Sequence, residues 1–70
     1  MAISYNKLWK LLVDKKMSKA DLRKAVGIAP NTMTKMRRDE PVAMETIIRI
    51  CECLGCDICD VMELVRTEGL

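Results

Sequence analysis

The sequence predicts an all-α fold, with five short helices that form one domain over residues 1–70. Apolar residues recur at spacings of three and four along the chain, which is the period of an amphipathic helix. Pro and Gly stand only at the junctions between these segments. No segment alternates apolar and polar residues as a half-buried strand would, so no strand is expected.

The first two helices are predicted from their apolar stripes and their ends. The first runs from about Ser4 to Lys16, and its inward stripe consists of Tyr5, Leu8, Trp9, Leu11 and Leu12. Ser18 is a suitable N-cap for the second helix, because Asp21 stands where a capping box needs its acidic partner. The second helix ends at Gly27, which adopts the left-handed conformation easily. Its inward residues are Leu22, Ala25 and Val26.

The third helix begins at Pro30, whose missing N–H costs nothing in a first turn. Met33 and Met36 mark its buried side. Its outward residues are Asn31, Thr32, Thr34, Lys35 and Arg38. A loop is expected at Asp39-Glu40-Pro41.

The fourth helix spans about Ala43 to Leu54, and Gly55 ends it. The inward stripe of this helix consists of Met44, Ile47, Ile50, Cys51 and Leu54. A last helix begins near Asp57, and its inward residues are Ile58, Val61, Met62 and Val65.

Charge is divided unevenly along the chain. Residues 1–38 carry ten Lys and Arg against two acidic residues, whereas residues 39–70 carry two against eight. The basic half predicts a surface for a polyanion. The chain contains no His, which is the commonest acid–base residue, and no Gly-rich phosphate loop. We therefore expect neither an enzyme nor a cofactor. Charged residues interrupt every apolar run, which predicts a cytoplasmic protein without a membrane span or a secretory signal.

The second and third helices are predicted to form a helix-turn-helix. Very few residues join them, so they must meet at a steep angle. Apolar positions lock the pair around a turn glycine; these are Leu22, Val26, Ile28, Met33 and Met36. Such a unit holds one short helix where its outer face fits the major groove of DNA.

The segment from Met17 to Met36, MSKADLRKAVGIAPNTMTKM, resembles the motif of lambda repressor and Cro-like (XRE) regulators. Val42-Ala-Met-Glu-Thr-Ile resembles the start of that family's fourth helix, and Ile50-Cys-Glu-Cys-Leu-Gly-Cys resembles its close. The resemblance covers about Tyr5 to Val65. It implies a lambda-repressor-like domain that binds double-stranded DNA as a transcriptional repressor, without a small-molecule ligand.

The resemblance also implies roles for individual residues. Pro30, Asn31, Thr34 and Lys35 fall on positions that face base edges; Asn31 suits adenine and Lys35 suits guanine. Lys19, at the start of the second helix, would hold a phosphate. Thr32, Arg37 and Arg38 would also contact phosphates.

Two departures from the family pattern stand out. Leu12 and Arg37 replace an Arg–Glu pair that is common in the family, and the loop after the third helix is acidic where relatives are often basic. This acidic loop keeps open an alternative function, a protein-interaction module of the same fold (an antitoxin or anti-repressor) with weak DNA binding.

The four cysteines, Cys51, Cys53, Cys56 and Cys59, have a C-x-C-x2-C-x2-C spacing that matches none of the usual zinc motifs. On one helix, Cys51 and Cys53 point about 200° apart, so they cannot share an ion. We expect structural cysteines; Cys53 or Cys59, if exposed, would be the candidate for redox or metal sensing.

Relatives commonly form dimers, which would place two reading helices about 34 Å apart, one turn of DNA. We expect a homodimer whose apolar seam contains Val61, Val65 and Leu70.

Overall fold

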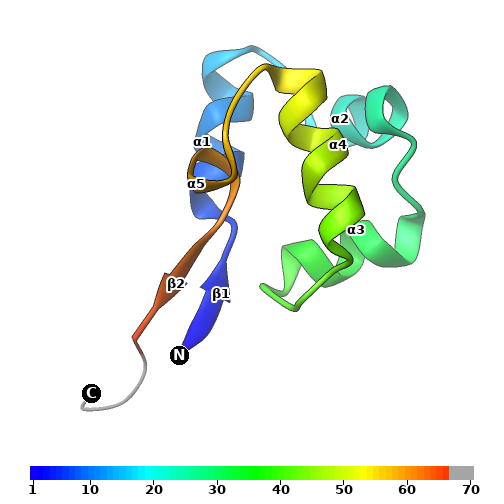
Figure 1. The fold of residues 1–70 in the computed structure, drawn as a ribbon. Helices are drawn as coiled ribbons and strands as arrows, with labels where there is room; N and C mark the ends of the chain where they lie inside the picture. The colour runs from blue at the N-terminus through cyan, green and yellow to red at the C-terminus, as the bar shows by residue number, and fades with distance from the viewer. Residues whose placement is uncertain (67–70) are drawn as a thin grey trace.

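The computed structural model describes residues 1–66, and the fold is the predicted one: five helices within these residues, packed around one core. The helices are α1 (Asn6–Asp14), α2 (Lys19–Val26), α3 (Pro30–Arg37), α4 (Met44–Leu54) and α5 (Ile58–Val61). Figure 1 shows α5 lying against α1, with α4 between this pair and the α2–α3 unit. The core therefore fills the space between all five helices.

The prediction of no strand is wrong. Strand β1 (Ala2–Ser4) pairs antiparallel with β2 (Glu63–Val65), with Ile3 opposite Leu64. Figure 1 shows the two strands leaving the helical body together, with the N-terminus at their far end. Each strand has only three residues, too few to show an alternating pattern, and the two lie at opposite ends of the sequence.

The strands also correct the bounds of two helices. Ser4 belongs to β1 and Tyr5 is the N-cap of α1, so that helix begins at Asn6. The last helix ends at Val61, because the backbone is extended from Met62 into β2. Val65, predicted to face inward from that helix, is an exposed strand residue instead.

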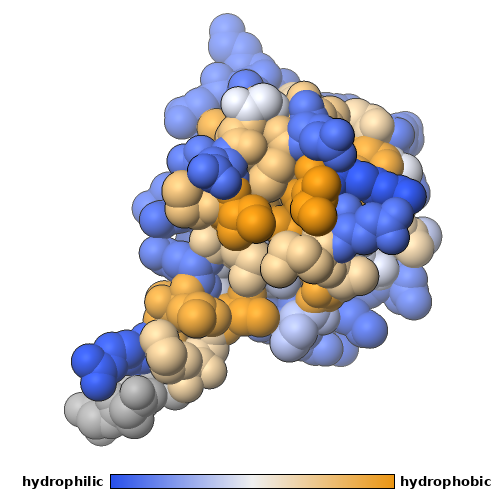
Figure 2. All heavy atoms as spheres, viewed as in Figure 1, coloured by the Kyte–Doolittle hydropathy of each residue, from blue (hydrophilic) through white to orange (hydrophobic). Residues whose placement is uncertain are grey.

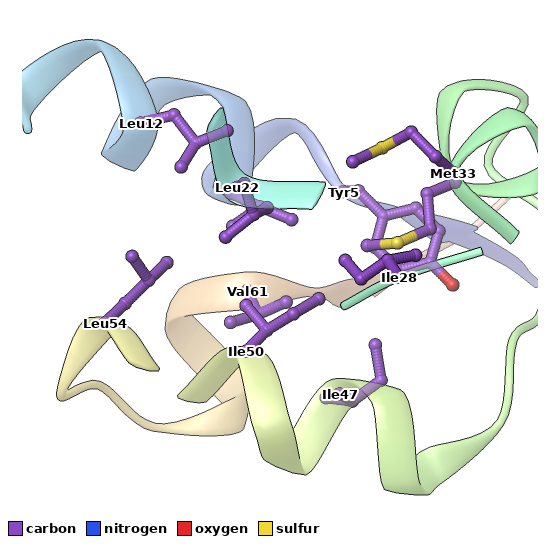
Figure 3. Close-up of a cluster of buried hydrophobic side chains, with 11 residues drawn as sticks. Tyr5, Leu12, Leu22, Ile28, Met33, Ile47, Ile50, Leu54 and Val61 are labelled. Atoms are coloured by element: carbon purple, nitrogen blue, oxygen red, sulfur yellow. The ribbon is translucent and has the colours of Figure 1, made fainter. Parts of the chain in front are cut away.

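Eleven buried side chains form the core, and Figure 3 shows them converging from all sides. They are Tyr5, Leu8, Leu12, Leu22, Ile28, Met33, Met36, Ile47, Ile50, Leu54 and Val61. Besides Val65, three predicted inward residues are exposed instead: Ala25, Met44 and Ile58. Met44 and Ile58 are the first residues of α4 and α5, and Ala25 lies on the flank of the Leu22–Val26 stripe, so each is beyond the edge of the packed face.

Candidate DNA-binding surface

Local contacts set both ends of α2. The Ser18 hydroxyl accepts a hydrogen bond from Asp21 N–H, and the Asp21 carboxylate accepts one from Ser18 N–H, which is the predicted capping box. These bonds lower the pKa of Asp21. At the other end of α2, Gly27 has a φ of 79°, and Ile28 N–H donates to the Arg23 carbonyl at 3.0 Å. Ile28 is buried, so it anchors the turn in the core.

The α3 helix is held by one face and presents the opposite one. Met33 and Met36 are almost fully buried. At about 100° per residue, the side opposite these two methionines carries four of the predicted contact residues. These are Asn31, Thr34, Lys35 and Arg38, and all four are exposed. Pro30 and Arg37 lie on one flank, also exposed.

Thr32 lies on the other flank of α3 and is half-buried. It borders a hollow of about 200 Å³ between the turn and α4, whose lining includes Thr46 and Arg49. Arg49 donates a hydrogen bond to Glu45 at 2.9 Å, one turn earlier on α4.

Two polar side chains on the outer face already make hydrogen bonds within α3. Asn31 Oδ1 accepts a bond from Thr32 N–H at 3.0 Å, and the Thr34 hydroxyl donates to the Pro30 carbonyl at 3.1 Å. The Asn31 NH₂ group and the Thr34 lone pairs are left for other partners. Neither Lys35, Arg37 nor Arg38 takes part in an ion pair within residues 1–66.

The C-terminal end of α3 is fastened to the start of α1. Asp39 Oδ1 accepts a hydrogen bond from Tyr5 N–H at 3.1 Å, and the buried Tyr5 hydroxyl donates to the Glu40 carbonyl at 2.9 Å. We call this arrangement the Tyr5 clamp. The acidic loop thus makes an intramolecular contact, in which a carboxylate lies at the N-terminus of α1, where the helix dipole favours negative charge.

Lys19 is the first residue of α2, at the start of the helix-turn-helix, whereas the clamp lies at its end. Its ammonium does not extend freely into solvent; Nζ lies over the ring of Trp9 on α1, 4.3 Å from the ring centroid. Both residues are half-buried.

The comparisons with known proteins agree with this geometry. The family model of the Cro/C1-type HTH DNA-binding domain matches residues 7–67. The chain belongs to this family. The crystal structure of the transcriptional regulator VanUg, form II, is similar to this Cro/C1-type domain with a TM-score of 0.92 and 44% sequence identity, over 94% of this chain and 88% of that one. The comparison with curated protein sequences gives no match.

The match to the Cro/C1-type model therefore confirms the predicted family, and DNA binding follows from membership of it. The structure brings six of the eight predicted contact residues onto α3 and places Arg38 just after it, whereas Lys19 lies apart on α2. Two contacts were not predicted from the sequence. They are the hydrogen bonds of Tyr5 to the end of α3 and the contact of Trp9 with Lys19. The position of Tyr5 in the apolar stripe predicts its burial but not its hydrogen bonds.

The cysteines of the domain lie away from α3. Cys51 and Cys56 are half-buried at the end of α4, and desolvation raises the pKa of both thiols. Cys53 and Cys59 are exposed. Within residues 1–66, no three His, Cys, Asp or Glu side chains are arranged to hold a metal ion. None of the helices in this part of the chain is long and apolar enough to cross a membrane.

Proposed function

We propose that this protein is a sequence-specific transcriptional regulator that reads the major groove with α3 and acts as a repressor. One observation carries the proposal: α3 is locked by Met33 and Met36 while its exposed side gathers polar and basic side chains. A short helix held in this way fits a major groove, where base edges are distinguishable. A bound domain of this size represses most simply by occupying the promoter. The similar VanUg chain is itself a transcriptional regulator.

The proposed contacts divide into two classes. Lys35 donates to guanine O6 and N7, and Asn31 pairs with adenine, while Pro30 and Thr34 lie against neighbouring base edges. Because Asn31 Oδ1 already accepts a bond from Thr32 N–H, its contact with adenine exchanges one hydrogen bond for another. Lys35 loses no such bond, so we expect it to discriminate bases more strongly than Asn31.

The second class contacts phosphates, which position the domain without reading sequence. It consists of Lys19, Thr32, Arg37 and Arg38. Arg37 lies on the flank of α3 and Arg38 follows the last helical residue, both exposed. Their guanidinium groups suit phosphate oxygens.

Alanine variants test this division. Asn31→Ala and Lys35→Ala should relax base preference at one position each, with a loss of about 1–3 kcal/mol of discrimination. Lys19→Ala should weaken binding to all duplexes equally and lower the salt slope by about 0.9. Lys10→Ala is the matched control, because it removes the same charge from the hollow between α1 and α5. Affinities for point-mutated duplexes measure both effects, and equal losses in all three site variants would contradict the division.

We further propose a homodimer on two half-sites, through a surface that keeps only Val65 of the predicted seam. Val61 is fully buried and cannot contact a second copy, and Leu70 lies outside the described residues. Exposed apolar side chains occur instead on α4, α5 and β2, namely Met44, Ile48, Ile58, Leu64 and Val65. Figure 2 shows apolar residues gathered on the face where α4 and the two strands are in view. Contiguous apolar surface of this kind often marks an interface.

Sedimentation analysis of charge variants tests the dimer. Ile48→Glu and Leu64→Glu should shift the protein towards the monomer and weaken binding to a two-half-site duplex. Val13→Glu, which places the same charge at an exposed apolar position on α1, should leave association unchanged. If the unmodified protein is a monomer at all concentrations, the dimer is contradicted, and the protein would bind a single short DNA site.

That residues 1–70 form a single domain stays a prediction.

A further inference from the structure

The contact between Trp9 and Lys19 joins the first two helices beside the DNA-binding unit. Lys19 Nζ lies 4.3 Å from the centroid of the Trp9 ring, within the range of a cation–π interaction. Trp9 is the only tryptophan in the chain. It packs against the core, and the residue is half-buried. The ring is therefore a fixed platform beneath a flexible cation.

The backbone beneath this cation is fixed as well. Lys19 is the first helical residue after the N-cap Ser18, whose hydroxyl accepts from Asp21 N–H at 3.0 Å. The amides of the first turn of a helix lack intrahelical acceptors, and the helix dipole adds a partial positive charge there. Lys19 thus belongs to the first turn of α2, where an anion is already favoured.

We propose that Trp9 is a positioning residue for DNA binding, whose ring holds the Lys19 ammonium at the N-terminus of α2. The ammonium is then already ordered when it meets a backbone phosphate. This inference rests on the phosphate role of Lys19 in the proposed function. A free lysine side chain loses rotamer freedom when it is fixed on a phosphate. A cation that is ordered in advance loses less, which is the usual gain from preorganisation.

The expected effect is small and has a distinct signature. Loss of the ring should weaken DNA binding by about two- to fivefold, the range that an exposed cation–π contact supports. It should leave the salt slope unchanged, because the same number of phosphates is still neutralised. Loss of the charge should weaken binding and also lower the slope by about 0.9.

The experiment is a double-mutant cycle with Trp9→Leu and Lys19→Met, measured on a labelled duplex of mixed sequence about three turns long. Binding is followed by fluorescence anisotropy over a range of salt concentrations, and thermal unfolding checks that each variant is folded. Trp9→Leu should cost nothing further in the Lys19→Met background, and Trp9→Phe, which keeps a π face, should restore part of the affinity. An equal cost of Trp9→Leu in both backgrounds would overturn the inference.

A second readout needs no DNA. In the free protein, Lys19→Met should change the emission of Trp9, whereas Lys24→Met, an exposed lysine further along α2, should not. Unchanged emission in Lys19→Met would overturn the inference. So would an unchanged salt slope in that variant, since there would then be no phosphate contact to position. Site-specific binding by the unmodified protein would survive either result, which separates this inference from the proposed function.

Discussion

The α2 and α3 helices share one hydrogen bond at their C-terminal ends, from the residue after the left-handed position to the carbonyl five residues earlier, but the left-handed residue itself differs. Ile28 N–H donates to the Arg23 carbonyl at 3.0 Å, and Glu40 N–H donates to the Lys35 carbonyl at 2.9 Å. The left-handed residue is Gly27 after α2 and Asp39 after α3, with φ values of 79° and 57°. The first end is made by a local backbone preference, whereas the second depends on contacts that are distant in sequence.

Those distant contacts explain why a residue with a side chain is left-handed after α3. The Asp39 carboxylate bonds to Tyr5 N–H, and the Tyr5 hydroxyl bonds to the Glu40 carbonyl. Left-handed backbone costs most non-glycine residues about 1–2 kcal/mol, and Asp somewhat less. A hydrogen bond to a charged group is worth about 1.5–3 kcal/mol, enough to offset that cost. One end of the reading helix is thus set by the turn and the other by the Tyr5 clamp.

The largest expected effect on stability is at the end of α2, which depends on local backbone conformation. Gly27→Ala should lower the free energy of unfolding by about 1–2 kcal/mol, because a Cβ disfavours this φ. The space around Gly27 is open, so the cost comes from the backbone alone. Gly27→Asn is the matched control, since Asn tolerates the left-handed region and should cost less. Urea unfolding measures both variants, and equal costs would show that the turn does not depend on backbone conformation.

Tyr5→Phe should break one bond of the clamp and lower the free energy of unfolding by roughly 1 kcal/mol. The variant also carries a pH signature. Burial, and then the charge of Asp39, raises the pKa of the Tyr5 phenol above its ordinary value of 10.0. The folded state therefore keeps the proton while the unfolded chain loses it. The contribution of the Tyr5 phenol to the free energy of unfolding is complete below pH 10.0. It is lost as pH rises through the pKa that the phenol has in the folded state.

The difference between the unmodified protein and Tyr5→Phe should consequently shrink above this pH. Urea unfolding of both proteins at a series of alkaline pH values measures that difference. Other groups that titrate in this range affect both proteins equally, so their contributions to the free energy of unfolding cancel in the difference. A difference that stays constant across the series would contradict the clamp as the cause.

The smallest expected effect on stability concerns a third helix end, the one after α1. Lys16, after α1, is also left-handed, with a φ of 57° and a 2.9 Å bond from Met17 N–H to the Leu12 carbonyl. Lys16→Gly should stabilise the fold by roughly 0.5 kcal/mol, because backbone relief exceeds the added freedom of the unfolded chain. Asp39→Gly should destabilise it by a similar amount, since it also removes the bond to Tyr5. Thermal unfolding distinguishes the two, and the same sign for both would contradict this account.

The parts of the fold that sequence could predict are those set within one or two turns of helix. The cap at Ser18, the end at Gly27 and the start at Pro30 all follow from local chemistry, as does the buried pair Met33 and Met36. These features also fix which side of α3 is exposed, so most of the candidate site was predictable together with the fold.

The parts that sequence could not predict depend on segments brought together by folding. β1 and β2 pair across nearly the whole chain, and Ser4 reads as a helix start when its strand partner Glu63 is unknown. The clamp joins Tyr5 to residues more than thirty positions away. Trp9 is a core residue by its spacing, and its contact with Lys19 depends on how α1 and α2 cross.

The central claim is that α3 reads bases, and selection of randomised duplex DNA by the purified protein tests it most directly. At near-physiological salt, we predict enrichment of a site with two half-sites about 10 base pairs apart. Lys35→Ala should lose the preference at one position of each half-site. No enrichment, with only weak and salt-sensitive binding, would contradict the claim and favour a protein-interaction module of the same fold.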